Sequence, residues 1–132
     1  MAKKPKILTE PHHRRPRSLG GTETPGNISN VTGKLHRHWH TLFGNMNAMQ
    51  ICDHINEMPQ KPRRLEVICK FINGIEVKKT GESHSRKQMK ITIAWNELFK
   101  DLTFKATINY INNTWLDPSY HLYTEKKKKR ST

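Results

Sequence analysis

The chain of 132 residues has few cysteines, few acidic residues and no long apolar run. Its two cysteines, Cys52 and Cys69, are too few for the disulfide framework of a small secreted domain. No apolar run approaches the roughly 20 residues that cross a bilayer, and the basic first residues lack the apolar stretch of a secretory signal. We therefore expect free, buried thiols and a protein that is not secreted.

Sequence signatures of enzymes are also missing. The chain contains no nucleophile-elbow motif, phosphate-binding loop, dinucleotide-binding glycine pattern or HExxH motif. Its carboxylates are scattered, and both cysteines stand beside apolar residues in positions typical of a core. We therefore expect a protein without enzymatic activity, catalytic residues or a cofactor.

Positive charge is the feature that the chain has in excess, and it is concentrated at the two ends. Lys and Arg number 24 against 11 Asp and Glu, a net charge of +13. Residues 1–17 carry a net +5, residues 124–132 a net +4, and the segment between them only +4. Because such charge density opposes a core, we expect a disordered basic arm and linker over 1–33, one domain over 34–123 and a basic tail over 124–132.

Apolar residues between Leu35 and Met58 recur every three or four positions, as on one face of an amphipathic helix. Thr32 is a suitable N-cap for this helix. The apolar spacing shifts by one position near Gly44 and Asn45, which predicts either one kinked helix or two short helices. Pro59 is expected to end the segment.

Alternating apolar residues predict strands over 65–72, 89–95 and 102–110. Asn73-Gly74 is a strong hairpin signal, so we expect residues 75–78 to pair with 65–72. Residues 119–123 fit a short edge strand or coil. The expected fold is α+β: an N-terminal amphipathic helix, or two short helices, packed on a three- to four-stranded antiparallel sheet with disordered basic arms at both ends.

Three basic segments supply the candidate nucleic-acid contacts: Arg14, Arg15, Arg17, Arg63, Arg64, Lys126, Lys127, Lys128, Lys129 and Arg130. We expect one polar sheet face to add phosphate contacts through Lys70, Lys90, Thr92, Thr103, Lys105, Thr107 and Asn109. Trp115, Tyr120 and Tyr123 are the aromatic residues that we expect to be exposed, where they can stack on unpaired bases. Trp39, Trp95 and Tyr110 share the apolar register and are expected in the core.

The histidines raise the question of a metal site. His36 and His40 are one helical turn apart and can chelate an ion, whereas His38 would point away from them. Cys52 and His54 add no recognised zinc-binding spacing. We interpret the histidines as part of a solvated basic face and expect no bound metal.

A small folded centre between two basic arms resembles, in layout only, many small viral RNA-binding, coat and matrix proteins, and also ribosomal proteins. We expect a sequence-tolerant nucleic-acid-binding protein of small viral or accessory type, with RNA favoured over DNA. The basic run Lys126–Arg130 predicts an import receptor as a second partner. We therefore expect the protein in the nucleus, with the cytoplasm as an alternative location. The alternative function is a matrix-type protein on an anionic membrane surface, and self-association is left open.

Overall fold

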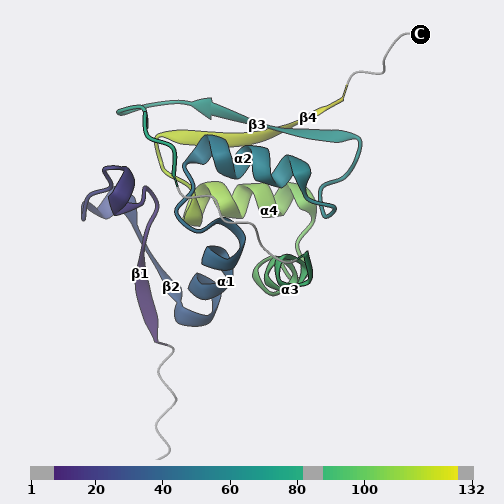
Figure 1. Ribbon diagram of the computed structural model, residues 1–132, viewed down its shortest axis with the longest axis horizontal. Coiled ribbons are helices and arrows are strands. Elements are labelled where there is room, and N and C mark those ends of the chain that lie inside the picture. Colours follow the sequence, from purple (N-terminus) through teal and green to yellow (C-terminus); the bar gives the residue numbers. More distant parts are fainter. Residues whose placement is uncertain (1–7, 82–87, 128–132) are drawn as a thin grey trace, which may run out of the picture.

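The computed structural model describes residues 8–81 and 88–127. Over these residues the fold is α+β, with four α-helices and two separate antiparallel sheets of two strands each. A ribbon formed by β3 (Leu65–Phe71) and β4 (Tyr120–Lys126) covers helices α2 (Ala48–Glu57) and α4 (Phe104–Tyr110), as Figure 1 shows. Helices α1 (Gly33–Phe43) and α3 (Gln88–Leu98) pack against each other farther from the ribbon.

The segment that was expected to be a flexible linker contains the second sheet. β1 (Thr9–His13) pairs in antiparallel register with β2 (Ile28–Thr32), and short 3-10 turns lie between them. The prediction of disorder over 1–33 is therefore wrong for residues 8–33. The reason is a set of long-range contacts: His12 is buried, and Arg14 and Arg15 bond to the segment 112–117. Residues 1–7 lie outside the described residues.

The segment with helical apolar spacing forms two short helices, which confirms the second of the two predicted alternatives, one kinked helix or two short helices. The Thr32 side chain accepts the backbone N–H of Leu35 and caps α1. Gly44 ends α1 at φ 54°, in the positive-φ region that favours glycine. Asn47 then caps α2 with a capping box that includes Gln50. The break at Gly44 and Asn45 therefore separates two helices that each have a cap of their own.

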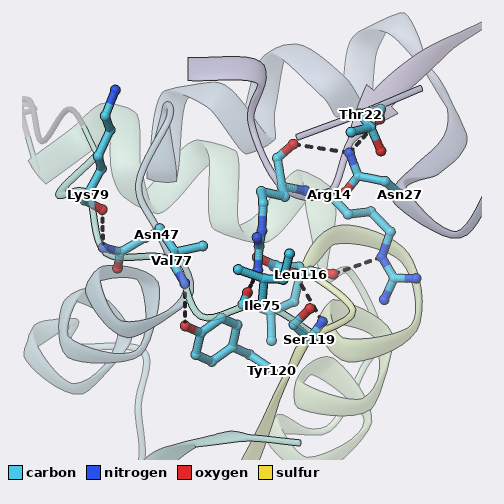
Figure 2. A network of polar contacts seen from close by, with 12 residues as sticks. Arg14, Thr22, Asn27, Asn47, Ile75, Val77, Lys79, Leu116, Ser119 and Tyr120 are labelled. Carbon is cyan, nitrogen blue, oxygen red and sulfur yellow. Dashed lines mark hydrogen bonds and ion pairs between the residues drawn. The ribbon is translucent and has the colours of Figure 1, made fainter. Parts of the chain in front are cut away.

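The predicted strand over 65–72 is present as β3, but its partner is not the one expected. β3 pairs with β4 through the register Leu65↔Lys126 to Phe71↔Tyr120. The predicted hairpin with 75–78 is wrong. A type I′ turn needs positive φ at both central residues, and only Gly74 has it, at 91°. The chain then leaves the ribbon, and Val77 donates its N–H to the Tyr120 hydroxyl (Figure 2).

Two predicted strands are helices. Residues 89–95 belong to α3, whose buried residues Ile91, Ala94 and Leu98 follow helical spacing, whereas Met89 and Ile93 are exposed. Residues 102–110 belong largely to α4, which Thr103 caps and which continues as a π-helical turn over Ile111–Trp115. Both segments alternate apolar and polar residues, but they also carry an apolar stripe at spacings of three and four. Packing of that stripe into the core decides the outcome.

The core is built around aromatic residues from several elements. Trp39 and Trp115 stack with ring centroids 5.0 Å apart, and Trp39 also contacts Phe43. Trp39 and Trp115 are 2 % and 0 % exposed. The Trp39–Trp115 stack joins α1 to the π-helical turn, 76 residues farther along the chain. It therefore links the two halves of the described structure.

Two asparagines complete the hydrogen bonding at the outer edges of the ribbon. The Asn56 amide of α2 both donates to and accepts from the backbone of Val67, with both distances 2.8 Å. The Asn112 amide does the same for Leu122, again at 2.8 Å. Each amide therefore replaces a neighbouring strand at one residue and gives a partner to backbone groups on the side of the strand that faces away from the ribbon.

Replacement of Asn112 by Ala is expected to lower the free energy of unfolding by about 2 kcal/mol or more, because it leaves the Leu122 N–H and C=O buried without partners. Urea denaturation measures the change. Asn109→Ala is a suitable control, since Asn109 lies exposed on the same chain segment. Equal losses in the two variants would contradict the strand-replacing role of the Asn112 amide.

Candidate functional site

Two basic segments that lie about half the chain apart in the sequence meet at one end of the ribbon. Leu65 pairs with Lys126, and Lys127 donates its N–H to the carbonyl of Arg64 at 2.8 Å. Arg63, Arg64, Lys126 and Lys127 are all exposed, and we call these four residues the basic ribbon end. Lys128, Lys129 and Arg130 of the predicted site continue the chain from this point but lie outside the described residues.

Lys61 is a further cation close to the basic ribbon end. Its ammonium group donates to the carbonyls of Pro62 and Leu65, at 3.2 and 2.6 Å. Desolvation and then repulsion from Lys127 lower its pKa. Glu66 and Glu125, which face each other one position farther along the ribbon, are exposed and offset part of the charge. The four cations of the basic ribbon end still exceed these two carboxylates.

The outward face of the ribbon carries polar and aromatic side chains. Along β4, Tyr120 and Leu122 are buried, whereas His121 is exposed and Tyr123 is half-buried. Tyr123 pairs with Ile68, and His121 pairs with Lys70. Of the three predicted stacking residues, Tyr123 is therefore the one whose ring remains partly open to solvent beside the basic ribbon end.

The predicted polar sheet face is wrong. Of its seven residues only Lys70 lies in a strand, because Lys90 and Thr92 belong to α3 and the others cap or form α4. Thr107 is 2 % exposed and packs inside the protein. The face was predicted from strand periodicity in segments that are helical, so its members do not share a surface.

Arg14 and Arg15 use their guanidinium groups inside the fold. Arg14 donates to the carbonyls of Leu116, at 2.7 Å, and Asn112 (Figure 2 shows the bond to Leu116). Arg15 forms an ion pair with Asp117 at 2.6 Å, and their side chains are 14 % and 6 % exposed. Arg17 differs, since its side chain is 76 % exposed and lies 3.7 Å from Glu23. Arg14 and Arg15 are therefore held by protein groups, and we leave them out of the candidate surface.

Trp115 and Tyr120 are buried, so the prediction that they are exposed stacking residues is wrong. Trp115 has no exposed surface, and Tyr120 is 7 % exposed. The Tyr120 hydroxyl accepts the N–H of Val77 at 3.0 Å, and its ring lies against Phe71. Trp115 ends the π-helical turn and Tyr120 begins β4, and both side chains belong to the hydrophobic core.

The structure also brings three histidines together. One ring nitrogen from each of His12, His36 and His40 lies within 4.8 Å of one from each of the others. His36 and His40 come from adjacent turns of α1, with their Nε2 atoms 3.0 Å apart. His12 comes from β1 and is buried. The sequence alone indicates the pair His36 and His40 but not His12, because residues 1–33 are predicted to be a disordered arm and linker.

Hydrogen bonds fix two of these rings. His36 Nδ1 lies 2.6 Å from a carboxylate oxygen of Glu10, and His12 Nε2 lies 2.9 Å from the carbonyl oxygen of Trp115. A carbonyl oxygen only accepts, so His12 Nε2 carries a hydrogen and Nδ1 carries the lone pair. Burial lowers the pKa of His12 to about 4, and His36 and His40 act in the same direction. His12 is therefore neutral near pH 7.

Neither cysteine has the properties of a nucleophile. The Cys52 thiol donates to the carbonyl of Val67 at 3.2 Å. Burial raises the pKa of Cys52 to about 11 and that of Cys69 to about 12. Because the thiolate is the reactive form, both side chains are unreactive near neutral pH.

Comparisons of the chain with protein-family models, curated proteins and solved structures found no match. Among the residues that the structure describes, none of the helices is both long and apolar enough to cross a membrane.

Proposed function

We propose that this protein is a non-enzymatic, sequence-tolerant nucleic-acid-binding protein that uses the basic ribbon end. The observation that carries the proposal is the register of β3 with β4, which places Lys126 and Lys127 beside Arg63 and Arg64. Cations from two separate segments are thereby brought together at one end of the β-ribbon, and the sequence continues with Lys128, Lys129 and Arg130. Closely spaced cations bind phosphates without reading base sequence.

The ribbon's outward face adds a second type of contact. Tyr123 is half-buried on the ribbon face that also carries His121 and Lys70, so a base that stacks on its ring would lie beside these two residues and about 10 Å along the strand from the basic ribbon end. Stacking requires an unpaired base, which favours single strands over duplexes. We propose RNA as the preferred nucleic acid, and an import receptor as a second partner of the segment that begins at Lys126.

The test measures affinity by fluorescence anisotropy for single-stranded and duplex RNA and DNA of equal length. We expect Lys126→Gln/Lys127→Gln and Arg63→Gln/Arg64→Gln each to weaken binding by about tenfold at low salt, since each removes two phosphate contacts. Lys78→Gln/Lys79→Gln is the matched control. It removes two exposed lysines that follow the opposite end of β3, and we expect little change.

Equal losses in the control and in the ribbon variants would mean that overall charge, and not this surface, determines binding. Vesicles that contain anionic lipid provide the competitor, because anionic headgroups attract the same cations. Our proposal predicts that nucleic acid displaces the protein from these vesicles. Retention on vesicles in excess RNA would overturn the proposal in favour of a membrane surface.

A further inference from the structure

We propose that His12, His36 and His40 bind one divalent transition-metal ion, and that Zn²⁺ is the ion that fits them best. The proposal concerns a site apart from the basic ribbon end. It depends on three imidazoles from two elements that the fold places together, with one nitrogen of each within 4.8 Å of those of the other two.

The spacing of the nitrogens fits a tetrahedral ion. Zinc binds imidazole nitrogen at about 2.0–2.1 Å, which places two ligands of a tetrahedral site about 3.3 Å apart. The Nε2 atoms of His36 and His40 are 3.0 Å apart, and the three ligand atoms lie within 4.8 Å of one another. A small rotation of the side chains therefore closes the site, and the ion takes the place of the proton that His36 and His40 share.

The groups around the histidines match those of zinc sites. Metal-bound histidines commonly donate their second ring N–H to a carboxylate or a backbone carbonyl, which fixes the tautomer. His36 makes this contact with Glu10, and His12 makes it with the carbonyl of Trp115. In each of these two rings the other nitrogen is therefore left to bind the ion. Histidines on a solvated basic face would not need the hydrogen bonds to Glu10 and Trp115.

The donor atoms also limit the choice of ion. Three neutral imidazoles suit zinc and its neighbours nickel and copper, whereas Mg²⁺ and Ca²⁺ prefer oxygen ligands. Three protein ligands leave one position of a tetrahedron for water or a ligand atom. A cavity of about 240 Å³ adjoins the cluster and is lined by all three histidines together with Trp39 and Trp115. The site therefore has room for a small fourth ligand.

An ion at this site would join β1 to α1. His12 lies in β1, and His36 and His40 lie in α1, so the ion would connect elements that are 24 residues apart in the chain. Such an ion binds the folded state in preference to the unfolded one and thereby raises the stability of the fold. Thermal unfolding therefore gives a second readout besides direct binding.

The experiment uses the full chain, stripped of metal with a chelator and titrated with Zn²⁺ by calorimetry. We expect one zinc ion per chain, no binding of Mg²⁺ and a higher unfolding midpoint with zinc. His36→Gln and His40→Gln should each weaken zinc binding by at least about 100-fold. Glu10→Gln should weaken it by about 10–100-fold, because a neutral amide replaces the carboxylate that accepts from His36. These three residues are partly or fully exposed, so their variants are expected to fold.

His38→Gln is the matched control, because it changes the histidine between the two α1 ligands and is expected to retain zinc binding. Circular dichroism of each metal-free variant separates loss of the site from loss of the fold. Failure of the folded wild-type chain to bind zinc at micromolar concentration would overturn the proposal. So would a His38→Gln variant that loses as much affinity as His36→Gln. Neither outcome affects the nucleic-acid proposal, whose variants lie in other residues.

Discussion

Replacement of Trp115 by Ala is expected to lower the free energy of unfolding by about 3–5 kcal/mol, the range for removal of a buried aromatic side chain. Trp115 has no exposed surface and stacks on Trp39, with Tyr110 and His12 against other sides of its ring. The substitution leaves a cavity between α1 and the π-helical turn. Because small domains have only about 5–15 kcal/mol in total, this one change should remove a large fraction of the stability.

Urea denaturation followed by circular dichroism measures this loss without depending on tryptophan fluorescence. Met49→Ala is the control, because Met49 is 52 % exposed on α2 and its removal should change stability by less than about 0.5 kcal/mol. The Trp115→Phe variant should retain part of the stacking on Trp39, so its stability should lie between those of Trp115→Ala and Met49→Ala. A Trp115→Ala variant as stable as Met49→Ala would place Trp115 on the surface, as the sequence alone suggested.

Removal of either partner of the Arg15–Asp117 ion pair is expected to cost about 3–5 kcal/mol, because the other charge is left buried and unpaired. The pair is 2.6 Å long and nearly inaccessible to solvent. Arg15 also donates to the carbonyl of Ile75, and Asp117 accepts the N–H of Ser119 at 3.0 Å. The pair therefore fixes the turn between β1 and β2 against the chain that leads into β4.

A double-mutant cycle tests this pair. Arg15→Ala and Asp117→Ala should each destabilise the protein strongly, whereas the double variant should lose much less than the sum, since no charge is left unpaired. Arg17→Ala is the matched control, because Arg17 is two positions away and 76 % exposed. Strictly additive losses would show that the two side chains act independently. A strong effect of Arg17→Ala would point to general charge reduction instead.

Local signals in the sequence were sufficient where neighbouring residues determine the structure. The N-cap at Thr32 and the break at Gly44 depend on contacts within a few positions, and both are confirmed. The alternation in 65–72 likewise predicted β3, because the face that contains Val67 is less exposed than the face that contains Glu66 and Lys70. These features need no knowledge of which distant segment packs against them.

The errors in the predicted secondary structure arise where contacts between distant segments determine the conformation. Residues 89–95 and 102–110 carry β-branched and aromatic residues at spacings that fit both a strand and a helix, and only packing against α1 and the ribbon selects the helix. Asn73-Gly74 predicted a hairpin, but β4 pairs with β3 from more than 40 residues farther along. A single sequence does not show which of two suitable segments will pair.

The candidate sites follow the same rule. The basic residues Arg63, Arg64, Lys126 and Lys127 could be selected from composition, yet their meeting at one end of the ribbon depends on the β3–β4 register. His36 and His40 were recognisable as an i,i+4 pair, whereas His12 joins them through the folding of β1 against α1. The signal available in the sequence was the pair His12-His13, but it lies in the segment that was predicted to be a disordered basic arm.

The salt dependence of binding tests the proposed function most directly. If the four cations of the basic ribbon end contact phosphates, the logarithm of the association constant should fall against the logarithm of salt concentration with a slope of about −3 or steeper. Lys126→Gln/Lys127→Gln should make that slope shallower by about 1.4–1.8, and Lys78→Gln/Lys79→Gln should leave it unchanged. A slope near zero for the wild-type chain, or one that the ribbon substitutions do not alter, would contradict the account.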